Sequence, residues 1–240
     1  MPGLGTLINA AGILLGGIIG MLAGKRIPER LRTLLTSVMG ISVIFIGAAG
    51  VLQRMLVIEG GALSTQGSMM MIFSLVLGGI VGSLLRIEDN CERFGEWLKK
   101  KTGNGGDARF TDGFVTASLT VCIGAMAIMG SIADGISGDI SILTTKAILD
   151  LVIIVVMSAS MGIGCMFSAI PVIVLQGSVT LLSRLMVQVM TDAAISNLSL
   201  TGSVLIFCVG INLCFGKKIA VGDLLPAVLF AVIFAFIPVL

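Results

Sequence analysis

The sequence predicts an all-α, polytopic membrane protein. Of its 240 residues, 56% are hydrophobic and 12% are charged, about half the charged share of an ordinary soluble domain. The mean hydropathy is +1.12, and apolar runs of about 20 residues, enough for a helix to cross a bilayer, recur along the chain. These observations predict a single transmembrane domain over residues 1–240, with seven or eight helices embedded in the lipid bilayer.

The individual helices are predicted from these runs. One long uncharged stretch, 151–183, exceeds a single span, and we divide it near Pro171 because a proline that follows Gly162 and Gly164 favours a broken helix. A seven-helix arrangement with a re-entrant segment at 166–190 is the alternative. The eight predicted spans lie at 1–24, 33–53, 60–85, 113–133, 147–166, 171–190, 199–215 and 224–240.

Basic residues favour the eight-helix arrangement. Most of the 15 lysine and arginine residues lie in three loops, at 25–32, 87–111 and 216–223, and short cytoplasmic loops are enriched in these residues. If all three loops are cytoplasmic, both termini are external, whereas the seven-helix alternative places the last loop outside. The net charge of +2 then reflects topology, and no nucleic-acid partner is expected.

The loop 87–111 is predicted to form a short interfacial helix and a linker. Apolar residues recur there with the helical period and form one face, next to the only tryptophan, Trp97, while charged residues fill the other face. Residues 1–86, before this loop, hold three spans, and residues 112–240, after it, hold four or five. The apolar residues are Ile87, Cys91, Phe94 and Leu98.

Glycine recurs at every fourth position in the first and third spans. In a bilayer, small residues at this spacing let two helix backbones approach closely. They therefore predict a helix-packing seam, or glycine zipper, either within the fold or between the copies of a homo-oligomer. The residues are Gly12, Gly16, Gly20, Gly24, Gly78 and Gly82.

The same two spans are similar in sequence. LGGIIGML at 15–22 nearly matches LGGIVGSL at 77–84, and GKRI at 24–27 is echoed by GKKI at 216–219. In the eight-helix arrangement each of these segments belongs to the inner end of an inward-running helix. The similarity therefore predicts an internal repeat of helical hairpins in parallel orientation, as is common in transporters.

Polar residues inside the spans are the candidates for a transport pathway. Such residues are costly in a bilayer and usually face a cavity or one another, so Asp150 and Gln176 come first. Lys146 lies four residues before Asp150 and is placed to pair with it, which would make the carboxylate a structural clamp instead. Further candidates, whose alternative role is to hydrogen-bond their own helix, are Thr116, Ser118, Thr120, Cys122 and Ser168.

Several longer motifs resemble a known family. They are CIGAMAIMGSIADGISGD at 122–139, TKAILD at 145–150, GIGCMFSAIPVIVLQGSVTLL at 162–182 and the opening GTLINAAGILLGGIIG at 5–20. Over nearly the whole chain, the sequence resembles bacterial integral membrane proteins of the domain-of-unknown-function 554 family. The resemblance implies a polytopic membrane protein for which transport is suggested, and it supplies no substrate or binding residue.

The sequence contains no pattern typical of an enzyme. It has no histidine and lacks phosphate-binding and metalloprotease motifs, so we expect no catalysis and no cofactor. Its 14 methionines and 5 cysteines follow no ordered ligand pattern, and no metal site is expected. We expect a transporter or channel for a small solute or ion, with its pathway through spans four to six. A non-transporting scaffold, which binds itself or a partner through its glycine seams, is the alternative.

Overall fold

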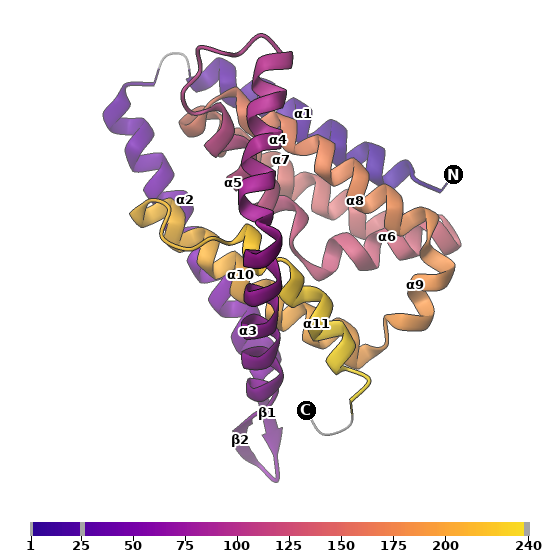
Figure 1. Cartoon of the computed structure of the whole chain (residues 1–240). Coiled ribbons are helices and arrows are strands. Elements are labelled where there is room, and N and C mark those ends of the chain that lie inside the picture. Colours follow the sequence, from indigo (N-terminus) through magenta and orange to yellow (C-terminus); the bar gives the residue numbers. More distant parts are fainter. Residues whose placement is uncertain (1, 25–26, 238–240) are drawn as a thin grey trace. The chain divides into compact units, whose positions relative to one another are not determined.

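The computed structural model describes residues 2–24 and 27–237, and these residues are mainly helical (Figure 1). In chain order the elements are α1 (Leu4–Gly24), α2 (Glu29–Met55), β1 (Leu56–Glu59), β2 (Ala62–Thr65), α3 (Ser68–Leu85), α4 (Ile87–Lys101), α5 (Phe110–Cys122), α6 (Ala125–Ser137), α7 (Ser141–Met161), the 3-10 helix η1 (Ile163–Ser168), α8 (Ala169–Leu181), α9 (Ser183–Val189), α10 (Asp192–Phe215), the 3-10 helix η2 (Gly222–Leu224) and α11 (Pro226–Phe234).

Among the described residues, six helical segments are long and apolar enough to cross a membrane. The pair α5–α6, bent by 62°, is a seventh candidate, and the segment Gly222–Phe234 is apolar but shorter. The predicted all-α, polytopic fold is therefore confirmed. The six segments are α1, α2, α3, α7, the stretch Ile163–Leu181 and α10.

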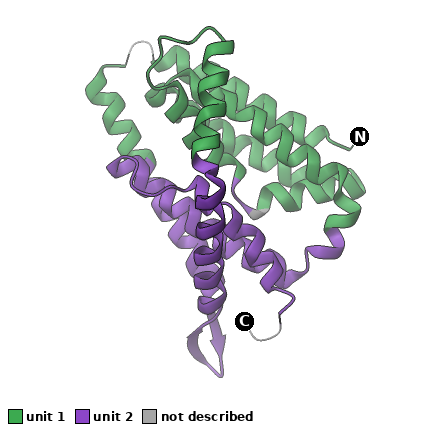
Figure 2. Cartoon of the chain, viewed as in Figure 1, with its two compact units in different colours: residues 1–39, 89–122, 126–186 green, residues 40–88, 123–125, 187–240 purple. Residues whose placement is uncertain are grey.

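The helices form two compact units (Figure 2). Both units are discontinuous in sequence, and each takes segments from before and after the loop 87–111. Unit 1 consists of residues 1–39, 89–122 and 126–186, and unit 2 consists of residues 40–88, 123–125 and 187–240.

In unit 1, α1 packs along α7 in the same direction. A Cβ atom added at Gly12 would lie 3.0 Å from the carbonyl oxygen of Ala147, and one added at Gly24 would lie 2.8 Å from that of Ala159. Only glycine permits so close an approach of two helix backbones. Residues of α1, α5, α7, η1 and α8 form the core, namely Ala10, Ile13, Ala117, Val121, Ile154, Met157, Cys165, Ala169 and Val172.

In unit 2, α3 packs in the opposite direction against η2 and α11. Cβ atoms added at Gly78 and Gly82 would collide with Ala227 and Asp223, respectively. The helix α10 also contacts α11 and α3. Both predicted glycine stripes are thus in contact with other helices of the same chain.

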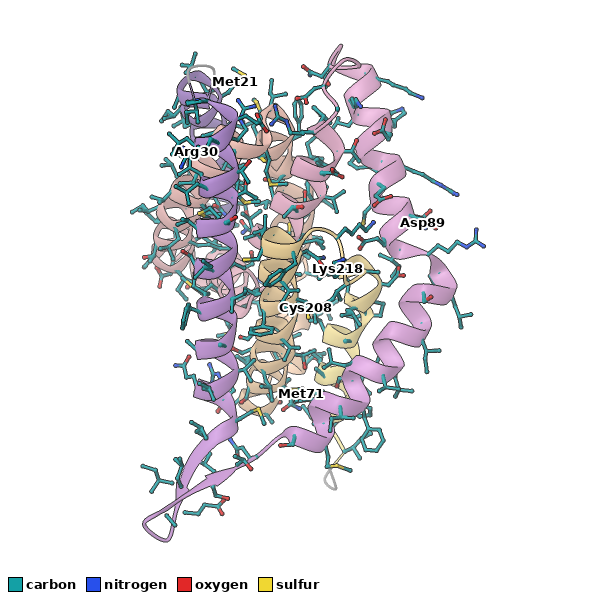
Figure 3. All side chains as sticks on the ribbon, turned by 90° about the vertical axis from the view of Figure 1, so that its left-hand side faces the viewer. Met21, Arg30, Met71, Asp89, Cys208 and Lys218 are labelled. Atoms are coloured by element: carbon teal, nitrogen blue, oxygen red, sulfur yellow. The ribbon has the colours of Figure 1, made fainter. Side chains whose placement is uncertain are left out.

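A β-hairpin occupies the first part of the segment that the sequence predicted as the third span. Strands β1 and β2 are antiparallel, with Glu59 opposite Ala62. The turn residues Gly60 and Gly61 have φ angles of 59° and 83°, as a two-residue type I′ turn requires. The hairpin projects beyond the ends of α2 and α3 (Figure 3). The helical part of this span therefore begins only at Ser68.

The helix break predicted near Pro171 lies earlier in the chain. Helix α7 ends at Met161, and Gly162 follows with φ of 94°, a left-handed value that favours glycine. Pro171 instead lies in the first turn of α8, where the missing N–H is tolerated because it has no partner within the helix. The predicted position of the break was wrong, and Gln176 lies within a continuous helix.

The remaining predicted features agree with the structure, differ from it or lie beyond the described residues. The predicted amphipathic helix is present as α4, and its Phe94 ring is 5.7 Å from that of Phe114. Asp134, which directly follows the predicted span at 113–133, is buried in α6. Within the last predicted span, α11 ends at Phe234, and residues 238–240 lie outside the described part. Residues 25–26, which are part of the first basic loop, also lie outside it.

Candidate functional site

Helix α7 places a buried ion pair in the interior of unit 1. The Lys146 ammonium group pairs with the Asp150 carboxylate one turn later, and only 8% and 6% of their side-chain surfaces are exposed. Both residues lie within the helix, because α7 begins at Ser141. Desolvation of each charge costs several kcal/mol, and removing one partner of a buried ion pair destabilises a protein by about 3–5 kcal/mol. The mutual pairing that the four-residue spacing allows is therefore needed to keep both charges in this position.

Lys146 has a second acceptor at the end of another helix. Its Nζ donates a hydrogen bond of 2.8 Å to the carbonyl oxygen of Val121, in the last turn of α5. Carbonyl groups at a helix C-terminus have no partner within the helix, and they attract cations. Cys122 lies close enough to interact with both charges. Interrupted helices whose freed carbonyl groups face an ion are typical of transporter binding sites.

Asn9 of α1 adds a polar group that the sequence analysis missed. It is fully buried and lies beside Asp150. Its side-chain amide is close enough to the Asp150 carboxylate to act as a hydrogen-bond partner for it. Asn9 was detectable as a rare polar residue in a glycine-rich span, although its partner helix was not.

Gln176 lies on a buried polar stripe of α8. Both of its amide atoms are buried and lack a hydrogen-bond partner within the described part of the chain, as do the hydroxyl groups of Ser168 and Thr180. Gln176 and Thr180 are four positions apart on α8 and therefore share one face of this helix, whereas Ser168 is the last residue of η1. Each unpaired buried polar group costs about 1–3 kcal/mol, so such a stripe is typical of a site that binds water or a solute.

The structure does not bring all the predicted polar residues together. Lys146, Asp150 and Cys122 lie near one another, whereas Gln176 lies on α8 and Ser168 ends η1, immediately before α8. Both α7 and α8 pack against α1 and α5.

Two of the predicted hydroxyl groups on α5 hydrogen-bond within their own helix. Ser118 donates to the carbonyl oxygen of Phe114 at 2.6 Å, and Thr120 donates to that of Thr116 at 2.8 Å. All three of these predicted residues, Thr116, Ser118 and Thr120, are half-buried.

Two pockets lie at opposite ends of the α1–α7 pair. The first has a volume of about 480 Å³ and includes Thr6 and Thr180 in its lining. The second, of about 240 Å³, includes Met21 and Ser158. Along α1, Asn9 lies between Thr6 of the first pocket and Met21 of the second. Neither pocket is lined by Asp150 or Gln176, so both pockets end short of these two residues, although the first reaches Thr180 of α8.

These features define a polytopic helical membrane protein with buried polar and charged groups in one of its two units. The chain belongs to the family described as "Protein of unknown function (DUF554)", whose model matches residues 4–236.

Two relatives match nearly the whole chain. The "Uncharacterized protein YqgA" of Escherichia coli (strain K12) is 27% identical over 235 residues, which cover 95% of this chain and 94% of the relative. The "Uncharacterized membrane protein YdfK" of Bacillus subtilis (strain 168) is 26% identical over 233 residues, which cover 97% of this chain and 96% of the relative. No solved structure was found to match the chain.

Proposed function

We propose that this protein transports a small solute or ion across the bacterial cytoplasmic membrane, and that it is not an enzyme. The pathway runs through unit 1, between the two pockets at the ends of α1 and α7. The observation that carries this proposal is the pair of buried polar side chains without partners on α8, Gln176 and Thr180, together with the buried ion pair of α7. A purely structural core would be more stable with apolar residues at these positions.

The ion pair is suited to couple transport to a charge. Lys146 has two acceptors, the Asp150 carboxylate and the Val121 carbonyl oxygen. When a proton or a cation neutralises Asp150, the ammonium group therefore keeps one partner. Asn9 and Gln176 offer both donors and acceptors to a dehydrated solute. In this mechanism the two pockets connect alternately to Asp150 and Gln176, neither of which lines a pocket in this structure.

Transport with cytoplasmic basic loops requires a defined set of helix directions, and we propose the eight-crossing topology with both termini outside. It is supported by packing within unit 2, where Gly40 lies against Cys214 and Gly47 lies against Phe207. These contacts make α2 and α10 antiparallel. With a re-entrant segment at 166–190, α10 would cross in the same direction as α2. Within unit 1, the parallel contact of α1 with α7 fits both arrangements, because α7 precedes the segment 166–190.

A non-transporting scaffold remains the second candidate. The close backbone contact of α1 with α7 favours it. The pairing of Lys146 with Asp150 also favours it, because a permanently paired carboxylate has a structural role. The two functions differ in what they require of Asp150.

The test is a flux screen in proteoliposomes, with ions, amino acids and organic acids as solutes. Asp150→Asn should abolish flux while the protein still elutes as a folded species, and Asp139→Asn, in an exposed loop, is the matched control that should retain flux. A clamp instead predicts a loss of stability of about 3–5 kcal/mol in Asp150→Asn, since Lys146 is left unpaired. Adding Lys146→Met should then restore much of it. Flux that persists in both Asp150→Asn and Gln176→Ala would exclude this pathway.

A further inference from the structure

A second buried carboxylate lies at the N-terminal end of α1. Asp134 of α6 is fully buried, and its Oδ2 accepts hydrogen bonds from the backbone N–H groups of Gly3, at 3.1 Å, and Gly5, at 3.0 Å. N–H groups at the start of a helix have no partner within it, and the helix dipole favours an anion there. These contacts account for one of the two carboxylate oxygens.

The other oxygen of Asp134 has no such partner. Oδ1 is buried and accepts no hydrogen bond from any described residue, and within the described ranges Asp134 is in none of the ion pairs. A helix N-terminus supplies only about half an elementary charge. The remaining negative charge in an apolar bundle is unfavourable unless a cation or a proton joins it.

Two further buried oxygen atoms lie on the elements that surround Asp134. The hydroxyl oxygens of Thr6 and Thr180 have no hydrogen-bond partner in the described part of the structure, and these residues are 3% and 6% exposed. Thr6 directly follows Gly5, which binds Asp134. The backbone oxygen of Thr180 lies 2.5 Å from where a Cβ atom of Gly135 would be. The chain therefore brings α1, α6 and α8 together at Asp134 and Gly135.

The larger pocket gives access to this place. Its lining includes Gly3, Thr6, Gly135 and Thr180, so it contains both threonines and the neighbours of Asp134 on two elements. Asp134 itself lies just behind this wall. In Figure 1 the start of α1, the end of α6 and the junction of α8 with α9 lie on the same side of unit 1.

We propose that Asp134, Thr6 and Thr180 form a binding site for a small monovalent cation, Na⁺, which enters from this pocket. Oxygen ligands suit hard cations. One carboxylate with neutral hydroxyl groups matches a single positive charge, whereas divalent ions are usually held by several carboxylates. The inference deepens the proposed transport function, because it names the transported or coupling ion, but binding can be measured without any flux.

The experiment uses the full-length protein in detergent, with Na⁺ added against choline at constant ionic strength. Na⁺ should raise the unfolding temperature, and ²²Na⁺ should bind saturably. Asp134→Asn should abolish both effects. Because this variant also alters the contact with α1, Thr180→Val is the second variant. It leaves Oδ2 and its donors in place and should weaken Na⁺ binding about tenfold, the loss of one ligand worth about 1.4 kcal/mol. Asp139→Asn is the matched control and should bind Na⁺ normally.

The outcomes separate this inference from the proposed function. Na⁺ binding that depends on Asp134 and Thr180, in a protein without flux of any solute, would support the site and refute transport. Flux without Na⁺ binding, or Na⁺ binding unchanged in both variants, would overturn the site and leave transport standing. Stabilisation by acid alone, with no effect of Na⁺, would show that Asp134 takes up a proton and would also overturn the Na⁺ site.

Discussion

Two carboxylates lie inside unit 1, and they are stabilised in different ways. Asp150 is paired with a lysine one turn away, whereas Asp134 is held by backbone N–H groups 129 and 131 residues distant in sequence. Replacing Asp150 by asparagine leaves a buried ammonium group with one acceptor fewer. Replacing Asp134 by asparagine keeps a carbonyl oxygen for the same N–H groups. The two substitutions therefore have different physical consequences, although the change in charge is the same.

The same difference in how the two carboxylates are held explains which of the polar contacts could be predicted from the sequence. A four-residue spacing on one helix is visible in the sequence, so the pairing of Lys146 with Asp150 was foreseeable. Asn9 and Asp134 depend on which helices become neighbours, and no local pattern encodes that. The missing signal was the presence of isolated polar residues in otherwise apolar runs, which marks burial but names no partner.

Glu96 provides a pH-dependent contact outside the spans. The hydroxyl group of Thr111 donates a hydrogen bond to Glu96 Oε1, and this bond, with the nearby Lys99 and Lys100, holds the pKa of Glu96 below its ordinary value of 4.5. A carboxylate whose pKa is lowered by folding stabilises the folded state above its ordinary pKa. The stabilisation is lost as the pH falls through the lowered pKa.

We therefore predict an acid transition in the contact between α4 and α5. The only tryptophan, Trp97, is next to Glu96 and reports the transition by fluorescence in a titration from about pH 6 down to about pH 2, a range that spans the ordinary carboxyl pKa and extends below it. Glu96→Gln should remove the transition, and Asp89→Asn, at an exposed position of the same helix, should retain it. The same transition in wild type and Glu96→Gln would rule out this contact as its origin.

At the scale of elements, the glycine spacing predicted where helices approach but not which helices meet. The stripe of α1 lies against Ala147, Leu151, Val155 and Ala159 of α7, which are also four residues apart but carry no glycine pattern. The hairpin β1–β2 was missed because its alternation of side chains is short and lies next to an apolar run. Its two adjacent glycines were the available signal for a tight turn.

The seam between α1 and α7 predicts a strong effect of bulk at Gly20. A Cβ atom there would collide with the carbonyl oxygen of Val155 and lie 2.8 Å from the Cβ atom of Ser158. Gly20→Leu should therefore destabilise the fold by more than the cost of about 1–3 kcal/mol that is typical of an overpacked core, because backbone atoms have to move. The measurement is thermal unfolding in detergent.

The matched control for this seam is Ile19→Leu, which places the same side chain on the exposed face of α1, where Ile19 is 49% exposed. It should unfold near the wild-type temperature. Equal unfolding temperatures for Gly20→Leu and Ile19→Leu would mean that the stripe does not mediate helix contact.

At the scale of the whole molecule, the sequence predicted the class of fold but not its division into units. Hydropathy identifies segments that need an apolar environment, and it carries no information about which of them pack together. The contacts instead join α1 to α7, and α3 to α11, across most of the chain. A division into consecutive parts at the loop 87–111 therefore does not describe the interleaved units.

The proposed topology makes a direct prediction for the loop between α10 and α11. With Arg86 at the edge of the second loop, the three basic loops hold 12 of the 15 lysine and arginine residues. All three loops obey the positive-inside bias only if this loop is inside. In a cysteine-free background, Lys218→Cys should resist a membrane-impermeant maleimide added to intact cells and react after the membrane is opened. Lys218 is preferable to Lys217, because Lys217 forms an ion pair with Glu88.

The positive control is Glu59→Cys, in the exposed hairpin β1–β2, which the same topology places outside and which should react in intact cells. The two sites are connected through α3 and the helices after it, so an even number of crossings between them would give both the same accessibility. Labelling of Lys218→Cys from outside, together with Glu59→Cys, would therefore refute eight crossings and favour the re-entrant segment at 166–190. Protection of Lys218→Cys alone supports the antiparallel arrangement of α2 with α10 in a membrane.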